Sequence, residues 1–81
     1  MEADPLKTEI LALLEQLRPD VDFGAEHNLI ADGLLTSFDV VMLVSELRRS
    51  LRVKIPAWAI RPEAFASLEA IAALAARWRT P

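Results

Sequence analysis

Apolar residues recur at helical spacing in three stretches of the chain. In the first stretch one face carries Leu6, Ile10, Leu13, Leu14 and Leu17, with charged and polar residues between them. Asp4 is suited to cap this helix, and Pro5 loses no hydrogen bond at the first helical position. Because the residue before a proline is disfavoured in helical geometry, we predict that the helix begins at Pro5 and ends before Pro19.

A second amphipathic stretch runs from Phe38 to about Arg52. Its inward stripe consists of Val40, Leu43, Val44, Leu47 and Leu51. Ser37 is predicted as the N-cap, because a serine oxygen can accept a hydrogen bond from an unpaired N–H group of the first turn. Asp39, in that turn, complements the positive end of the helix dipole. A second face is apolar first and basic later, and consists of Phe38, Val41, Met42, Ser45, Arg48, Arg49 and Arg52.

The third helical stretch follows Ser67, which is predicted to cap it. Its inward residues are Leu68, Ile71, Leu74, Ala75 and Trp78. Before it, residues 53–55 (VKI) are predicted to form an extended connector that buries Val53 and Ile55, and residues 56–60 a short helix that Arg61-Pro62 ends. We expect Trp58 and Trp78 to be packing residues. A second possible role for Trp58 is to border a groove in which a bound cargo would lie.

Residues 19–36 carry neither a helical nor a strand period. They still contain apolar anchors, namely Val21, Phe23, Leu29, Ile30, Leu34 and Leu35, and a turn signal at Asp32-Gly33. We therefore expect an ordered loop over the core with one short helical turn. The whole pattern predicts a single all-α domain over residues 1–81, a small four-helix bundle of three main helices and one short helix, with a long first loop.

Composition narrows the possible functions. The chain has no cysteine, so disulfide and thiolate chemistry are excluded, and its net charge of −3 argues against nucleic-acid binding. No apolar stretch is long enough to span a bilayer and no signal-peptide pattern is present, so we expect a cytoplasmic monomer without membrane insertion. Four basic residues lie within seven positions, namely Arg48, Arg49, Arg52 and Lys54. Such a cluster is either a solvated helix face or a docking patch.

Residues 32–38, with the sequence DGLLTSF, lead directly into the second predicted helix. This stretch resembles the attachment motif of the acyl and peptidyl carrier protein family, in which a serine starts the second helix. Residues 52–56 (RVKIP) are similar to the family's connector, and residues 61–74 (RPEAFASLEAIAAL) to its entry into the last helix. The resemblance covers nearly the whole chain, and its motif is nearest to D-alanyl carrier proteins and peptidyl carrier domains.

The resemblance implies that Ser37 carries a covalent 4′-phosphopantetheine arm derived from coenzyme A. The arm would supply the thiol that the chain lacks and hold acyl or aminoacyl groups as thioesters. The implied partners are a phosphopantetheinyl transferase, an adenylating acyl or aminoacyl ligase, and a downstream acyltransferase or condensing enzyme. The chain itself would be a carrier and not an enzyme, with a docking face that consists of Phe38, Val41, Met42, Ser45 and Arg48.

Two features depart from the family pattern. In the family, an Asp directly before the serine helps the modifying enzyme hold its metal ion; Thr36 stands there in this chain, with Asp32 and Asp39 as the nearest carboxylates that can take its place. Carriers of fatty acid synthesis present an acidic second helix to basic partners, whereas here that helix bears Arg48, Arg49 and Arg52. A specialised biosynthetic pathway, not fatty acid synthesis, is therefore expected.

Two other classes of function stay open. Because Thr36 replaces the family's Asp, the sequence is also compatible with a helical interaction module, or with a carrier-like domain that receives no arm. A hydrolase could use Ser37, His27 and Asp39, which are the residue types of a catalytic triad. No Gly-x-Ser-x-Gly elbow is present, and a chain of 81 residues leaves little room for a substrate pocket. We therefore expect no catalytic residues. We expect His27 to cap or pack locally in its loop. One histidine with scattered carboxylates likewise predicts no metal site.

Overall fold

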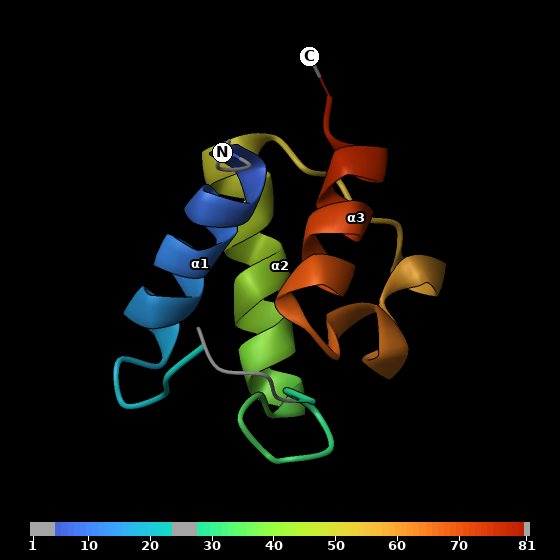
Figure 1. Cartoon of the computed structure of the whole chain (residues 1–81). Coiled ribbons are helices and arrows are strands. Elements are labelled where there is room, and N and C mark those ends of the chain that lie inside the picture. Colours follow the sequence, from blue (N-terminus) through green and yellow to red (C-terminus); the bar gives the residue numbers. More distant parts are fainter. Residues whose placement is uncertain (1–4, 24–27, 81) are drawn as a thin grey trace.

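Three α-helices form the body of the computed structural model, which describes residues 5–23 and 28–80. Helix α1 spans Pro5–Leu17, α2 spans Ser37–Leu51 and α3 spans Leu68–Trp78. Helix α1 runs antiparallel to α2 and α3 and packs against both of them (Figure 1). The predicted all-α class is confirmed for the described residues. The residues invoked as the cap of α1 and as a possible base, Asp4 and His27, lie outside the described residues.

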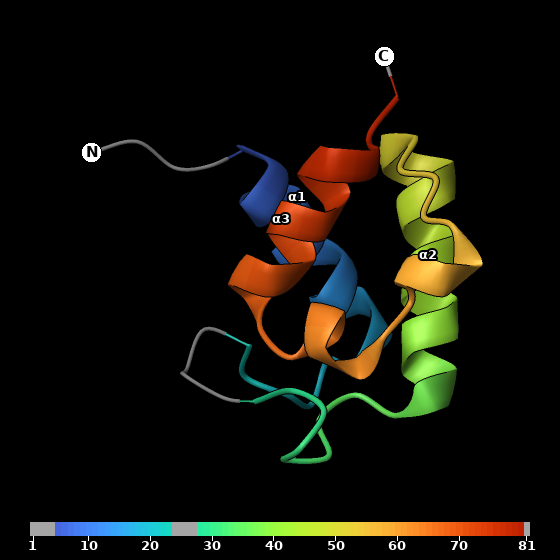
Figure 2. The same cartoon turned by 90° about the vertical axis from the view of Figure 1, so that its right-hand side faces the viewer.

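The short helix predicted over residues 56–60 is a single 3₁₀ turn, and a second 3₁₀ turn follows it, so the described residues form three α-helices and not four. These turns are η1, Ala57–Ala59, and η2, Pro62–Phe65. Pro62 prevents one continuous helix, since the preceding Arg61 is held in extended geometry at φ −132° and ψ 149°. Figure 2 shows both turns in the segment that leads from the end of α2 to α3.

The three helices share one apolar core, and the predicted inward stripes supply most of it. Ile10 and Leu14 of α1, Leu47 of α2 and Ile71 of α3 are fully buried. Phe65, at the end of η2, is also fully buried, although no helical periodicity marked it in the sequence. The core therefore depends on an irregular segment as well as on the helix faces.

The loop between α1 and α2 is ordered where it is described, as the sequence predicted. Leu29 and Leu35 are buried, and their backbones are joined by a hydrogen bond from Leu35 N to Leu29 O of 2.8 Å. Leu29 N also donates to Ala66 O at 2.7 Å, which attaches the loop to the entry of α3. Gly33 has a φ of +74°, a left-handed conformation that explains the glycine in the predicted turn.

Helix α2 is capped at its C-terminal end by Arg52, a residue in the left-handed conformation, and a short extended connector follows it. Arg52 has φ 57° and ψ 36°, and the N–H of Val53 reaches back to Leu47 O at 3.1 Å. Val53 is fully buried and forms an isolated antiparallel bridge with Arg79. Flanking hydrogen bonds, from Lys54 N to Trp78 O and from Thr80 N to Arg52 O, tie the connector to the end of α3.

Trp58 does not pack in the interior, contrary to the sequence-based expectation. Its side chain is 70% exposed and contacts the half-buried Trp78 edge-on, with ring centroids 5.6 Å apart. The reason is the 3₁₀ geometry of η1, a single short turn in which Ala59 takes the buried position. Trp78 does pack against the core, as predicted. Among the described residues, no helix is long and apolar enough to cross a membrane.

Candidate functional site

The start of α2 is organised by a capping box in which Thr36, and not Ser37, is the N-cap. Asp39 N donates to Thr36 Oγ1 at 3.1 Å, and Thr36 N donates to Asp39 Oδ2 at 2.9 Å. The predicted capping role of Ser37 is therefore wrong. The physical reason is the spacing of the motif: an acidic residue stands three positions after Thr36, whereas the apolar Val40 stands three positions after Ser37.

Asp39 is buried and is held by a residue from α1's C-terminal end. Arg18 Nη1 lies 3.1 Å from Asp39 Oδ2 and 3.3 Å from the carbonyl oxygen of Leu34. Burial opposes ionisation of Asp39, but the hydrogen bonds from Thr36 and the ion pair with Arg18 outweigh it and hold the pKa of the carboxyl below its ordinary value of 3.8. The capping box and the end of α1 thus form one polar clasp, which consists of Arg18, Thr36 and Asp39.

This clasp corrects a second expectation about the site. Asp39 was one of two carboxylates considered as a stand-in for the family's metal-holding Asp. With only 8% of the residue exposed and with Thr36 and Arg18 as its partners, Asp39 is not presented to an approaching enzyme. Asp32 is exposed and accepts a hydrogen bond from Asn28 N at 3.2 Å. Arg18 is the residue that the sequence analysis missed, and a basic residue just beyond the last helical turn was its only signal.

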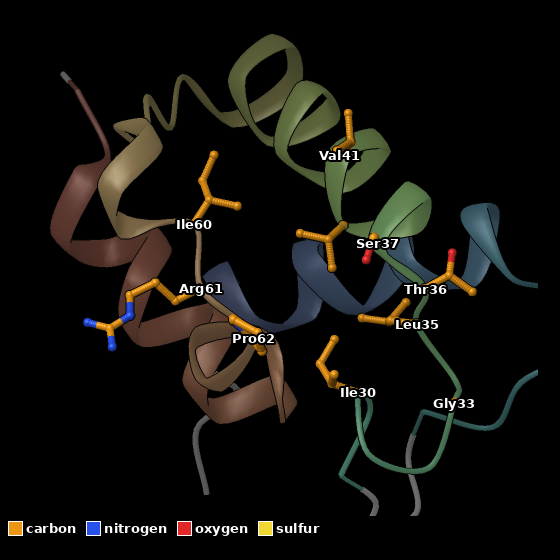
Figure 3. Close-up of a pocket in the computed structure, with 10 residues that line it drawn as sticks. Ile30, Gly33, Leu35, Thr36, Ser37, Val41, Ile60, Arg61 and Pro62 are labelled. Atoms are coloured by element: carbon orange, nitrogen blue, oxygen red, sulfur yellow. The ribbon is translucent and has the colours of Figure 1, made fainter.

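Ser37 is the first residue of α2, and its side chain is exposed. Thr36 supplies the oxygen of the cap, and within the described residues the Ser37 hydroxyl has no hydrogen-bond partner. The residue borders an open groove of about 520 Å³ (Figure 3). A serine whose hydroxyl has no structural partner is accessible to an external reagent.

The groove beside Ser37 is mainly apolar. One wall comes from the loop and the start of α2, including Leu35 and Val41, and the opposite wall from Ile60 and Pro62 (Figure 3). The Arg61 side chain extends away from the opening, with its Nε 3.6 Å from Glu63 Oε1. Trp58 does not line this groove.

The predicted docking face of α2 lies on the molecular surface. Phe38 is 70% exposed, Val41 62% and Met42 39%, and Ser45 and Arg48 are exposed farther along the helix. The core stripe is filled by other residues of α2, as the periodicity predicted. The structure thus leaves Phe38, Val41 and Met42 exposed on the face of α2 near Ser37.

The arrangement does not assemble a catalytic triad from the described residues. The carboxylate of Asp39 is directed to Arg18 and Thr36, and the one histidine of the sequence, His27, lies outside the described residues. Within residues 5–23 and 28–80, no group of three metal-binding side chains comes together. What the described site offers is an accessible hydroxyl, a helix N-terminus and an apolar groove.

No protein-family model matches this sequence, and the comparisons with curated proteins and with solved structures also give no significant match.

Proposed function

We propose that the protein is a free-standing acyl or aminoacyl carrier, with a 4′-phosphopantetheine arm attached to Ser37. The observation that supports this most directly is the hydroxyl of Ser37. It is exposed at the first turn of α2 and takes no part in the capping box, which Thr36 and Asp39 complete without it. A serine kept for structure alone would be expected to cap the helix, so its free hydroxyl favours a chemical role.

The surroundings of Ser37 fit the proposed group. A phosphodiester on the serine oxygen would lie at the N-terminus of a 15-residue helix, where unpaired N–H groups and the helix dipole favour negative charge. The apolar groove beside it gives the arm or a short cargo a surface to lie on. Gly33, on the rim, leaves open space where a side chain would project.

In the proposed reaction the Ser37 oxygen forms a bond to phosphorus while the pyrophosphate bond of coenzyme A breaks and 3′-phosphoadenosine 5′-phosphate leaves. The serine proton passes to a base on the transferase. The arm supplies the thiol that holds the acyl or aminoacyl group as a thioester. An adenylating ligase would load the arm, and an acyltransferase or condensing enzyme would unload it. The chain's own contribution is recognition of these partners, through the face of α2 that consists of Phe38, Val41, Met42, Ser45 and Arg48. Docking through this face raises the effective concentration of the cargo at each partner. We expect these reactions to take place in the cytoplasm.

Intact-mass spectrometry after incubation with coenzyme A and a promiscuous phosphopantetheinyl transferase tests the proposal. We expect the mass of one arm to be added to the protein, and none to Ser37→Ala. Ser50→Ala is the matched control, because Ser50 is an exposed serine of the same helix outside the proposed docking face, and it should be modified like the original protein. An unchanged mass, or modification that survives Ser37→Ala, would refute the carrier function.

The residue before Ser37 provides a second, graded test. Thr36→Asp keeps a good N-cap residue and introduces the carboxylate that carrier proteins have at this position. We expect the initial rate of modification to rise in this variant while Ser37 stays the only modified site. An unchanged rate would show that Thr36 is not what distinguishes this chain as a transferase substrate.

A helical interaction module without an arm is the second candidate. It is favoured by Thr36 and by the engagement of Asp39 with Arg18, which together leave no carboxylate adjacent to Ser37 for a metal ion. This alternative predicts an unmodified Ser37 under every transferase condition, and partner binding that depends on Phe38 and Val41 but is unaffected by Ser37→Ala.

A further inference from the structure

A strongly basic region extends from the second half of α2 into the connector. Residues 47–62 contain no Asp or Glu, although the whole chain has 12 acidic residues against 9 basic ones. The exposed residues Arg48, Arg52 and Lys54 lie in this region. Within the part of the chain that the structure describes, none of the three forms an ion pair, whereas Lys7, Arg18, Arg49 and Arg61 each have a carboxylate partner.

Two of these unpaired cations flank a cleft. The cleft has a volume of about 330 Å³ and lies between α2 and the connector, with Arg48 and Lys54 among its lining residues. Val44, Ile55 and the half-buried Trp78 supply an apolar lining. It is separate from the groove beside Ser37, since the two share no lining residue.

The frame of the cleft is fixed by backbone contacts. Lys54 N donates to Trp78 O at 3.1 Å, so the Lys54 and Trp78 backbones are joined, and the bridge between Val53 and Arg79 holds the two segments together. Arg48 stands on a regular turn of α2. The backbone segments that carry the two cations and the aromatic ring are therefore already ordered before a partner binds. This order limits the conformational entropy that is lost on binding.

We propose that this cleft binds an acidic, apolar segment of a partner protein. Carboxylates of the partner would meet Arg48 and Lys54, which have no internal counter-charge. An aliphatic or aromatic side chain of the same segment would contact Trp78 and Ile55. Arg48 stands about 16 Å along the helix axis from Ser37, at 1.5 Å per residue, so the cleft anchors a partner at a distance from the serine.

A protein segment fits better than a polyanion. The net charge of −3 repels a nucleic acid or an anionic membrane at long range, whereas a short acidic segment meets only the local positive field. The apolar lining also has no counterpart in a phosphate backbone. The exposed Phe38 and Val41 lie on the same helix and extend the apolar contact toward Ser37.

The test uses the full chain, unmodified at Ser37, and a synthetic peptide of Glu, Leu and Phe as the probe. In a nuclear magnetic resonance titration we expect the amide signals of residues 44, 48 and 53–55 and the Trp78 indole signal to shift. Arg48→Gln/Lys54→Gln should weaken the binding about ten-fold. The matched control Arg49→Gln/Arg61→Gln removes the same charge from exposed residues outside the cleft and should weaken it less than about two-fold.

Four results would overturn the proposal: no shifts at the cleft, equal weakening in the control, equally tight binding of the peptide with Gln in place of Glu, or tighter binding of an oligonucleotide or of phosphatidylglycerol vesicles. All substituted side chains are exposed, so the variants should fold like the original protein. Because the titration needs no arm on Ser37, its failure would leave the proposed carrier function untouched, and the reverse is also true.

Discussion

Thr36 and Ser37 are neighbours with similar hydroxyl chemistry, yet the fold uses them differently. Thr36 Oγ1 accepts from Asp39 N and donates to Asp39 Oδ2, at 3.1 and 3.0 Å. Ser37 is one position too late for this exchange, because a capping box needs its acidic partner three residues on. At the scale of a residue, one step along the chain separates a structural hydroxyl from one available for chemistry.

This difference predicts opposite effects of two alanine substitutions. Thr36→Ala should lower the free energy of unfolding by about 1 kcal/mol, since it removes the N-cap oxygen of α2. Ser37→Ala should change it by less than about 0.5 kcal/mol, because alanine is a good helix former and no hydrogen bond is lost. Urea unfolding followed by circular dichroism measures both values. A larger loss for Ser37→Ala than for Thr36→Ala would show that the cap has been assigned to the wrong residue.

At the scale of the elements, polar contacts join the helices at their ends while apolar faces join them along their length. Arg18 links the end of α1 to the capping box of α2, and Lys7 Nζ lies 2.7 Å from Glu69 Oε2 between α1 and α3. The second pair is exposed on the Glu69 side and contributes little. The first includes a buried carboxylate, so loss of Arg18 leaves Asp39 without its counter-charge.

The Arg18–Asp39 contact predicts a pH-dependent contribution to stability. The folded-state pKa of Asp39 lies below its ordinary value of 3.8, so the ionised carboxyl stabilises the fold fully above a pH of about 5. That contribution is lost as the pH falls below 3.8 through the folded-state pKa. Asp39→Asn should therefore cost about 1–3 kcal/mol at neutral pH and less at a pH of about 2, because the contribution of the ionised carboxyl falls with the pH.

Urea unfolding of both proteins at the two pH values measures this difference. Glu63→Gln is the control, because it removes a carboxylate whose partner Arg61 is also exposed, and it should change stability little at either pH. A deficit for Asp39→Asn that stays constant with pH would contradict the assignment.

At the scale of the whole molecule, one core joins the helices to the irregular segments. Leu29 and Leu35 from the first loop, Val53 from the connector and Phe65 from η2 are buried with the faces of the three α-helices. A small domain has few alternatives for filling its interior, so the loops serve as parts of the core. This arrangement also places the Ile60–Pro62 segment opposite Ser37.

The shared core predicts a contrast between two aromatic residues of the same segment. Phe65→Ala should cost about 3–5 kcal/mol, because it leaves a cavity where a fully buried ring was. Trp58→Ala should cost less than about 1 kcal/mol, since only its edge-on contact with Trp78 is lost. Thermal unfolding followed by circular dichroism at a wavelength of backbone absorption measures both. Similar losses for the two variants would mean that Trp58 is buried in solution.

Periodicity predicted the helices well because each has an amphipathic stripe that can be buried on one face. The stripes of α2 and α3, the cap at Ser67 and the buried Val53 all lie where the sequence indicated, with Ser67 Oγ accepting from Ala70 N at 3.0 Å. Expectations failed where periodicity carries no information. Trp58 is large and apolar, but a single 3₁₀ turn has no stripe, and packing with the rest of the chain decided its exposure.

The sequence by itself determined the helical class, the three α-helices and the position of Ser37 at a helix entrance, because these depend on residues close together in the chain. Only the tertiary structure decided that Thr36 caps α2 with Asp39 held by Arg18, that Ser37 faces a groove built with residues 60–62, and that Arg48 and Lys54 share a cleft with Trp78. Those features join segments distant along the chain. Their geometry is set by packing around the common core, which no local pattern encodes.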